Sequence, residues 1–458
     1  MLNNDRVNTG VINTAVTEVQ VLRLGCAVPA EAAFDALYRD APYAFWLDSA
    51  SGARFSFMGA ASRVMRAWPD RIELDGEVLA PGVFAWLADV LTERVEVPDV
   101  PFGFTLGWVG YLGYELKAEC GGGRAFESVD PDAVLMYVDR TIVFEQDETY
   151  LVSTDHDWIT ETAALLAALP KPAPARPIVA TEVRARHSRD KYIKMIEACQ
   201  EAIRGGESYE VCLTNMVSAQ ADIDPWNAYR LLRKHSPAPH GAYLRLGDIA
   251  VLSSSPERFL RILPDGTVES RPIKGTRPRG ATQAEDVALC QDLATNEKDR
   301  AENLMIVDLV RNDLGRHAVV GSVEVPAIFQ VETYATVHQL VSTIRARLRP
   351  DVSLVHCVQS AFPGGSMTGA PKIRTMEIID TLEEGPRGVY SGVLGYFSLS
   401  GHVDLSIVIR TLVVRQGEVS FGVGGAIIDP SDPGAEFDET VVKATAMLRV
   451  LGAEFPTE

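Results

Sequence analysis

The hydrophobic positions of the chain follow two periods. In segments such as 55–58 and 135–144, apolar residues occupy alternate positions, which predicts β-strands. Around 30–38 and 160–168 they recur at the spacing of a helix face, which predicts α-helices. Segment 169–177, L-P-K-P-A-P-A-R-P, breaks both patterns, because its prolines favour an extended spacer. We therefore place a boundary there, between a region 1–175 and a region 183–455.

Two helices are predicted after that segment. Thr282 and Glu285 stand at the spacing of a capping box, which predicts the start of a helix. A second helix is predicted from Asn296 to Leu314. Apolar residues lie on most of its faces, so we expect this helix to be buried.

The loop 363–372, P-G-G-S-M-T-G-A-P-K, leads into a further predicted helix, with Pro371 suited to its first turn. Free backbone N–H groups there, together with the hydroxyls of Ser366 and Thr368, would suit an anion. The loop lacks the G-K-[ST] ending of a phosphate-binding P-loop, so it does not indicate a nucleotide site.

Residues 390–426 alternate like three antiparallel strands, with hairpin turns predicted at 400–401 and 416–417. In that register, Arg410 lies on the middle strand between both of its neighbours. The prediction is sensitive to register, since a slip of one residue turns a side chain to the other face.

The same register brings Tyr390, Arg410, Gly424 and Gly425 together. A guanidinium, a phenol and exposed backbone would suit a carboxylate. The alternative is a cross-strand contact between the arginine and the tyrosine, with the glycines at a bulge. The pattern alone leaves both interpretations open.

Acidic residues recur at helical spacing in two segments. Glu436, Glu439 and Lys443 would share one face of a helix. Asp299 and Glu302 stand at the same spacing in the helix predicted to be buried. The two acidic pairs could supply the oxygen ligands that Mg²⁺ prefers. The alternative is a solvated acidic face, which suits Glu302 least because an unpaired buried carboxylate is costly.

Composition limits the classes of partner. The 458 residues are enough for two packed units with a substantial core. Forty-three basic and 62 acidic residues give a formal charge of −19, which disfavours binding to a phosphate backbone. A small anionic substrate would be repelled at long range, so an anion site must be built from local cations, backbone N–H groups or a metal.

The cysteines and the amino-terminal segment bear on location. Six cysteines occur without a C-x-x-C pair, so neither a zinc site nor a disulfide framework is indicated. Residues 1–10 lack a signal-peptide pattern, and no apolar run approaches the roughly 20 residues that span a bilayer. We expect a cytoplasmic protein.

Seven motifs together resemble one family, the chorismate-utilising enzymes, which include anthranilate, isochorismate, salicylate and aminodeoxychorismate synthases. They are S-S-S-P-E-R-F (253–259), P-I-K-G-T-R (272–277), A-E-N-L-M-I-V-D-L-V-R-N-D (301–313), P-G-G-S-M-T-G-A-P-K (363–372), V-Y-S-G (389–392), I-R-T (409–411) and D-E-T-V-V-K-A (438–444). The resemblance covers most of the chain, and its specific motifs all lie in the second region.

The resemblance implies an α+β fold with two large antiparallel sheets packed face to face and helices outside. It implies that Glu302 and Glu439 are the principal Mg²⁺ ligands, with Glu436 and Asp299 nearby or acting through water. The residues that it places around the substrate chorismate, a dianion, are Arg410, Tyr390, Gly424, Gly425, Lys443, Ser366, Thr276 and His338. Taken alone, His338 would be interpreted as a core histidine.

The position of Lys274 divides the chemistry within the family. Anthranilate synthases resemble this motif but carry alanine there, and P-I-K-G-T is the pattern of aminodeoxychorismate synthases. The resemblance implies that Lys274 attacks C2 of chorismate while the C4 hydroxyl leaves, after which ammonia attacks C4. Glu257 matches the family's general acid, which protonates the leaving hydroxyl. The alternative for Glu257 is an ion pair with the adjacent arginine.

A nucleophilic lysine must be neutral. At the ordinary pKa near 10.4, fewer than about one lysine in a thousand is neutral at pH 7. We expect burial, or a distant cation such as Lys443, to lower the pKa of Lys274. The neighbouring Arg271 and Arg277 would point away from Lys274 in an extended strand, on the side opposite to Thr276.

Three further expectations concern water, ammonia and regulation. Isochorismate and salicylate synthases carry a lysine base where this chain has Glu210, which argues against hydrolytic chemistry. No G-x-C-x-G glutaminase signature occurs, so a separate glutamine amidotransferase subunit is implied. Region 1–175 resembles part of anthranilate synthase component I, and tryptophan could bind near L-D-S-A (47–50), although the regulated pattern L-L-E-S is absent.

The leading hypothesis is therefore the aminating subunit of an aminodeoxychorismate synthase, which makes 4-amino-4-deoxychorismate for 4-aminobenzoate and folate biosynthesis. Anthranilate synthase component I is the alternative enzyme. A non-catalytic protein that binds chorismate or a glutaminase is the alternative of another class.

Overall fold

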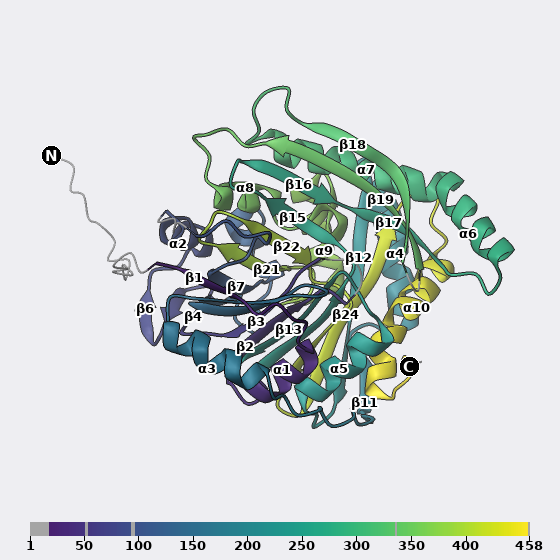
Figure 1. Cartoon of the computed structure of the whole chain (residues 1–458). Coiled ribbons are helices and arrows are strands. Elements are labelled where there is room, and N and C mark those ends of the chain that lie inside the picture. Colours follow the sequence, from purple (N-terminus) through teal and green to yellow (C-terminus); the bar gives the residue numbers. More distant parts are fainter. Residues whose placement is uncertain (1–17, 51–53, 93–96, 335–336, 457–458) are drawn as a thin grey trace.

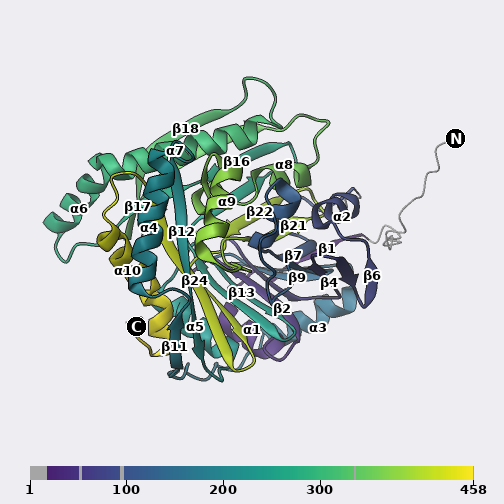
Figure 2. The same ribbon diagram turned by 180° about the vertical axis from the view of Figure 1, so that it is seen from behind.

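The computed structural model describes residues 18–50, 54–92, 97–334 and 337–456, and residues 1–10 considered above lie outside this part. Within it, the strands form two antiparallel sheets of twelve strands each, flanked by helices (Figures 1 and 2). The fold expected from the motifs is confirmed. No helix in the described ranges has the length and apolar character needed to cross a membrane.

The first sheet contains, in spatial order, β1 (Gln20–Arg23), β10 (Thr149–Ser153), β9 (Arg140–Phe144), β3 (Ser56–Ala60), β2 (Tyr43–Asp48), β13 (His240–Leu246), β14 (Ile249–Ser255), β23 (Thr411–Arg415), β24 (Glu418–Ile427), β12 (Glu210–Gln220) and β11 (Thr181–Ala185), and β20 (Gly369–Ala370) pairs with β12. The second contains β17 (Ile273–Pro278), β19 (Val337–Arg347), β16 (Thr267–Arg271), β15 (Arg258–Ile262), β22 (Val403–Ile407), β21 (Val393–Ser398), β7 (Gly107–Leu112), β8 (Ala133–Val138), β4 (Arg63–Trp68), β5 (Arg71–Leu74) and β6 (Glu77–Leu79), and β18 (Glu324–Thr333) pairs with β19.

The helices are α1 (Ala30–Leu37), α2 (Val83–Val90), α3 (His156–Leu166), α4 (Arg189–Arg204), α5 (Pro225–His235), α6 (Gln283–Thr295), α7 (Glu297–Gly315), α8 (Leu354–Ala361), α9 (Lys372–Glu383) and α10 (Pro433–Leu451), with 3-10 turns η1 (Tyr114–Cys120) and η2 (Gly365–Met367). The side chains of Val109 and Tyr111 from the second sheet pack with those of Leu244 and Val251 from the first in one buried cluster. This cluster is the core between the two sheets.

The proline-containing segment 169–177 has neither helix nor strand. Strands from both sides of it nevertheless share each sheet: β2 pairs with β13 in the first, and β7 pairs with β21 in the second. The boundary therefore divides the sequence, while both sheets are built from both regions.

The prediction of one three-strand meander at 390–426 is wrong. β21 and β22 form a hairpin in the second sheet, whereas β23 and β24 form a hairpin in the first. The chain crosses between the sheets at 408–410, where Arg410 has a left-handed φ of 50°. The 416–417 turn is confirmed by the Arg415–Glu418 pair. The earlier hairpin has a longer loop, because Phe397 pairs with Val403.

The same ambiguity affected 135–144, which is split between β8 in the second sheet and β9 in the first. Alternation with a period of two marks strand faces, and it carries no information on which sheet a strand enters.

The helix predictions fare differently from one another. Thr282 caps α6 as predicted, accepting from the backbone N–H of Glu285, and Glu285 accepts in return from the Ala281 N–H. Helix α7 begins after Asn296, whose side chain caps it. The expectation that α7 is buried on most faces is wrong: Leu304 is 45% exposed, and only the side that carries Glu302, Ile306 and Val307 is buried.

Candidate functional site

The candidate residues gather where an edge of each sheet meets two helices. Strand β17 comes from the second sheet, and β12 and β24 come from the first. Helix α7 packs on β17, and α10 packs on β24. Both ribbon views place these elements side by side (Figures 1 and 2).

Lys274 on β17 is paired with Glu210 at the start of β12. Its Nζ lies 2.5 Å from Glu210 Oε1, and the two side chains are 10% and 1% exposed. The second oxygen, Glu210 Oε2, is buried and has no hydrogen-bond partner among the described residues. The pair joins the two sheets at the centre of the site.

This pairing corrects the expected pKa of Lys274. Burial alone would lower the pKa, but the carboxylates of Glu210 and Glu302 outweigh burial, so the pKa of Lys274 is raised above its ordinary value. Lys274 is therefore an ammonium ion in this state of the protein. The sequence argument considered Glu210 only as a position that lacks a lysine, and so missed its role as a partner.

The arginines around Lys274 are bound to other acids. Arg271 pairs with Glu332, and Arg279 pairs with Asp286. Arg277 bonds two acids from the flanking helices, Asp292 and Asp299. The basic segment is thus not one patch, in agreement with the sequence argument.

Strict alternation does not hold along β17. The pairing of β17 with β19 shifts register between Ile273 and Thr276, and Gly275 has a φ of 83°. A Cβ on Gly275 would lie 2.8 Å from Asp299 Cγ, so this close approach requires glycine. The argument that placed Thr276 on the same side as Lys274 therefore fails at this bulge, and Thr276 is exposed.

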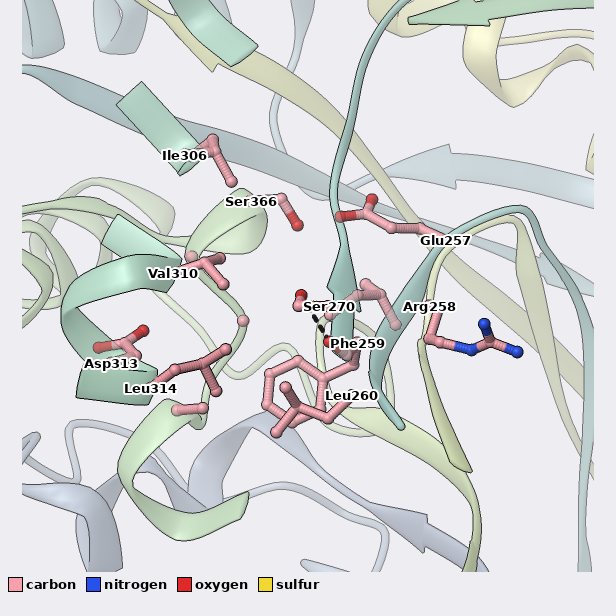
Figure 3. A pocket seen from close by; sticks show the side chains of 14 residues that line it. Glu257, Arg258, Phe259, Leu260, Ser270, Ile306, Val310, Asp313, Leu314 and Ser366 are labelled. Carbon is pink, nitrogen blue, oxygen red and sulfur yellow. Dashed lines mark hydrogen bonds between the residues drawn. The ribbon is translucent and has the colours of Figure 1, made fainter. Parts of the chain in front are cut away.

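Glu257 lies between β14 and β15 and is 6% exposed. Burial raises the pKa of Glu257 to about 7, although the Ser366 hydroxyl and the Lys274 charge oppose the rise. Figure 3 shows the Ser366 hydroxyl pointing toward the Glu257 carboxyl. A carboxyl group with this pKa can hold a proton near neutral pH and donate it.

A small cavity of about 20 Å³ lies beneath Glu257 and Ser366, with room for about one water molecule. Ile306 and Val310 of α7 line one side, and Phe259 of β15 lines another (Figure 3). The mostly apolar wall explains why the charged form of Glu257 is disfavoured.

Of the four predicted acids on α7 and α10, Glu302 and Glu436 contact the same lysine. Glu302 and Glu436 are buried, at 8% and 4% exposure, and Lys298 lies between them. Its Nζ is 2.8 Å from Glu436 Oε1 and 3.7 Å from Glu302 Oε1. Burial raises the pKa of Glu302 to about 7, with Lys274 and Lys298 opposing that rise.

The other two predicted ligands are engaged elsewhere. Glu439 is 51% exposed and pairs with Lys443 at 2.8 Å on its own helix. Lys443 outweighs burial and lowers the pKa of Glu439. Asp299 accepts from Arg277 at 2.9 Å. Within the described ranges, no three acidic, histidine or cysteine side chains stand close enough together to hold a metal ion.

The donor set nevertheless fits Mg²⁺ chemically. Carboxylate oxygens are the ligands that this ion prefers, and Glu302 and Glu436 are buried acids from two helices that contact the same lysine. The raised pKa of Glu302 means that its charge is only partly compensated by the protein. Additional positive charge would stabilise the ionised site.

Gly424 and Gly425 lie on β24 opposite Thr214 and Leu213 of β12. Lys443 Nζ donates to the Gly424 carbonyl at 3.1 Å. A Cβ on Gly425 would lie 3.5 Å from Lys443 Nζ and 3.6 Å from Glu436 Oε2. The backbone of Gly425 therefore lies beside the side chains of Lys443 and Glu436.

Arg410 stands at the crossing between the sheets. Burial lowers the pKa of Arg410, and no hydrogen bond or ion pair offsets this effect in the part of the chain that is described. A partly buried guanidinium that has no partner among the described residues suits an incoming carboxylate. Tyr390 is buried with its ring against Gly422, where a Cβ would lie 2.1 Å from Tyr390 Cδ1.

His338 and Thr368 have protein partners. His338 contacts Asp286 through Nε2 at 2.9 Å and Thr333 through Nδ1 at 2.8 Å, which matches the core-histidine interpretation of this residue alone. The Thr368 hydroxyl donates to the Gly364 carbonyl, so it does not point to an anion site in this loop. Ser366 remains beside Glu257.

Two residues that the sequence argument missed are central here. Glu210 pairs with the candidate nucleophile, and Lys298 joins two candidate metal ligands. Lys298 stands four residues before Glu302, a spacing that could have identified it. Glu210 carried no such local signal, because its partner is distant in sequence.

In the segment 47–50, Asp48 is buried and forms an ion pair with Arg233 of α5. Tyr229 also donates to this carboxylate, at 3.3 Å. Burial outweighs both partners and raises the pKa of Asp48.

Comparison with known proteins gives consistent matches. A family model described as chorismate binding enzyme matches residues 42–449. A Streptomyces griseus relative named aminodeoxychorismate synthase is 56% identical, over 93% of this chain and 63% of its own length. A Klebsiella aerogenes relative named aminodeoxychorismate synthase component 1 is 40% identical, over 77% of this chain and 78% of its own. The chain thus spans less than two thirds of the length of the Streptomyces relative.

Among solved structures, anthranilate synthase component I from Streptococcus pneumoniae TIGR4 superposes with a TM-score of 0.77. The sequences are 28% identical, and the match covers 86% of this chain and 92% of the other. The two-sheet fold agrees with that neighbour.

Proposed function

Because the chain belongs to the family of chorismate-binding enzymes, we propose that it aminates chorismate to 4-amino-4-deoxychorismate, as the aminating part of an aminodeoxychorismate synthase. The names of its relatives support this reaction, and the lysine at position 274 favours it over anthranilate formation. The product would serve 4-aminobenzoate and folate biosynthesis.

The observation that carries the proposal is a buried lysine near a buried carboxyl group with a pKa of about 7. The charge of Lys274 acts on Glu257, so the two groups share one site. One group can attack the substrate while the other protonates the leaving hydroxyl. On a solvated surface, the glutamate would be ionised at neutral pH and could not donate this proton.

The reaction begins with loss of a proton from Lys274. Glu210 is the acceptor that the geometry offers, at 2.5 Å. The neutral amine attacks C2 of chorismate, and both ring double bonds shift by one position as the C4 hydroxyl leaves as water with the proton of Glu257. Ammonia then attacks C4, the double bonds shift back, and the bond from C2 to the lysine nitrogen breaks. The excess proton on the new amino group returns to Glu257, and the proton held by Glu210 returns to the released Lys274.

The anionic substrate needs local positive charge in a chain whose formal charge is −19. Arg410 has no counter-ion among the described side chains and would bind one carboxylate. Lys443 of α10 and the backbone of Gly425 on β24 lie beside each other and offer a second positive group and backbone donors. Magnesium held by Glu302 and Glu436, with Glu439 and Asp299 on the same two helices, would neutralise further substrate charge.

The remaining substrate contacts are proposed from the motifs alone. Tyr390, Ser366, Thr276, His338 and the Gly424 backbone match family positions. The partners that His338 already has and the exposure of Thr276 make them the weakest members of this set.

Ammonia would come from a glutamine amidotransferase subunit. The Klebsiella aerogenes relative is named component 1, which supports a second component for that protein. Six free cysteines suit a reducing cytoplasm, where we place the reaction. Tryptophan would have to compete with Arg233 for Asp48 if it binds at 47–50.

The test incubates the purified chain with chorismate, Mg²⁺ and ammonium and identifies products by mass spectrometry. We expect 4-amino-4-deoxychorismate. Anthranilate with released pyruvate would assign the chain to anthranilate synthases instead. No turnover, even with a glutaminase added, would favour a binding protein.

A second measurement tests the nucleophile. Without ammonia, the chain should accumulate a chorismate-derived adduct on Lys274, found by peptide mapping, and Lys274→Ala should abolish it while chorismate still binds. Lys372→Ala is the matched control, because Lys372 is similarly buried (11% exposed) and pairs with Asp313 at 2.7 Å. An adduct that survives Lys274→Ala would show that another residue is the nucleophile.

A further inference from the structure

Lys298 connects the two helices that carry the candidate metal ligands. It stands in the first turn of α7, and its ammonium group bonds Glu436 of α10 at 2.8 Å. Glu302 of its own helix lies 3.7 Å away. Lys443, by contrast, pairs with an acid of its own helix. Lys298 therefore lies where a positive charge serves both buried carboxylates.

The two carboxylates need such a charge. Glu302 and Glu436 are almost fully buried, and two ionised groups this close repel each other in a medium of low polarity. Ser431 also donates to Glu436 at 2.7 Å, but a hydroxyl brings no net charge. Lys298 is the positive charge that contacts both carboxylates and so links the two helices.

Lys298 is also free to leave. The side chain of Lys298 is 45% exposed, whereas the side chains of Glu302 and Glu436 are 11% and 4% exposed. The flexible four-carbon stem can turn the ammonium group into water without opening the core. The carboxylates themselves lack this freedom, because both are held on helices packed against the sheets.

We propose that Lys298 is an exchangeable counter-ion, which holds Glu302 and Glu436 together in the metal-free protein and swings into solvent when a divalent cation binds. This inference rests on the magnesium site proposed above. It adds that the affinity for the cation is set by competition with a lysine of the chain. A static structural ion pair would instead support metal binding or leave it unchanged.

The experiment compares the wild type with Lys298→Met, which keeps an unbranched side chain one atom shorter and removes its charge. Binding of Mg²⁺ is measured by calorimetry, and binding of Mn²⁺ by electron paramagnetic resonance, both without substrate. We expect Lys298→Met to bind each metal about fivefold more tightly, the scale of a partly exposed ion pair. Lys298→Arg keeps the charge and should stay close to the wild type.

Thermal unfolding supplies a second readout. Without metal, Lys298→Met should melt at a lower temperature than the wild type, and added Mg²⁺ should raise its melting temperature by more. The matched control is Lys191→Met, since Lys191 of α4 is equally exposed at 45% and pairs at 2.8 Å with Glu384, the residue after α9. This control should not change metal affinity.

Unchanged or weaker metal affinity in Lys298→Met would overturn the inference and leave the magnesium site standing. If neither protein binds Mg²⁺ or Mn²⁺, the metal site itself is wrong, and the inference falls with it. The amination proposal is judged separately, by the product assay.

Discussion

The pair of Lys274 and Glu210 allows a quantitative prediction that does not depend on the reaction. The two side chains are 10% and 1% exposed, and their charged atoms are 2.5 Å apart. At an effective dielectric constant near 20, the attraction is about 7 kcal/mol, and desolvation of the two ions offsets most of it. Removing one partner leaves the other charge buried, which costs about 3–5 kcal/mol.

We therefore expect Lys274→Met to lower the free energy of unfolding by about 3–5 kcal/mol. The double variant Lys274→Met/Glu210→Gln should lose only about 1 kcal/mol, because no charge remains buried alone. Urea titrations at pH 8 measure these values. The folded pKa of Lys274 lies above the ordinary 10.5, so its stabilising contribution is fully present at that pH and is lost only at higher pH.

The single variant Glu210→Gln completes the cycle, which should give a coupling energy of at least about 2 kcal/mol. The same cycle on the buried pair of Lys372 and Asp313 gives the coupling energy of a comparable ion pair outside the proposed reaction. If the losses from Lys274→Met and Glu210→Gln simply add in the double variant, the two groups do not interact in solution. The proposal that Glu210 receives the lysine proton would then lose its basis.

Three further predictions use other buried charges. Burial raises the pKa of Glu257 from 4.5 to about 7, so ionisation of this group lowers the stability of the wild type as pH rises from 4.5 to 7. Urea titrations should show that the free energy of unfolding of Glu257→Gln increases by about 3 kcal/mol relative to that of the wild type over this range. Arg410→Met should leave the melting temperature unchanged or higher, while the Kd for chorismate rises about ten- to hundredfold, and a large loss of stability would reveal a protein partner for this arginine. Arg387→Met, which strands Glu383 at 2% exposure, should cost about 3–5 kcal/mol in unfolding free energy, and adding Glu383→Gln should recover part of it.

Local signals predicted several elements correctly. The capping box of Thr282 and Glu285 and the 416–417 turn rest on contacts between residues a few positions apart, and both are confirmed. The acids at helical spacing lie on α7 and α10 for the same reason. The two-sheet fold was available only through the motifs and their resemblance to a family.

Long-range contacts decided what local patterns left open. Residues 390–426 alternate throughout, yet the chain changes sheets at Arg410, because each hairpin packs against a different neighbour. Leu304 looked like a buried residue of an apolar helix, and it is 45% exposed because α7 contacts the sheet on one side.

The sequence by itself determined the inventory of the site: a lysine, a glutamate acid, four carboxylates at helical spacing and an arginine beside a tyrosine. Only the tertiary structure decided their charges. Lys274 meets Glu210 from a strand of the other sheet, which raises the pKa that burial alone would lower. The physical reason is that a pKa depends on burial and on every charge within a few ångströms, and those neighbours come from strands and helices that the sequence separates widely.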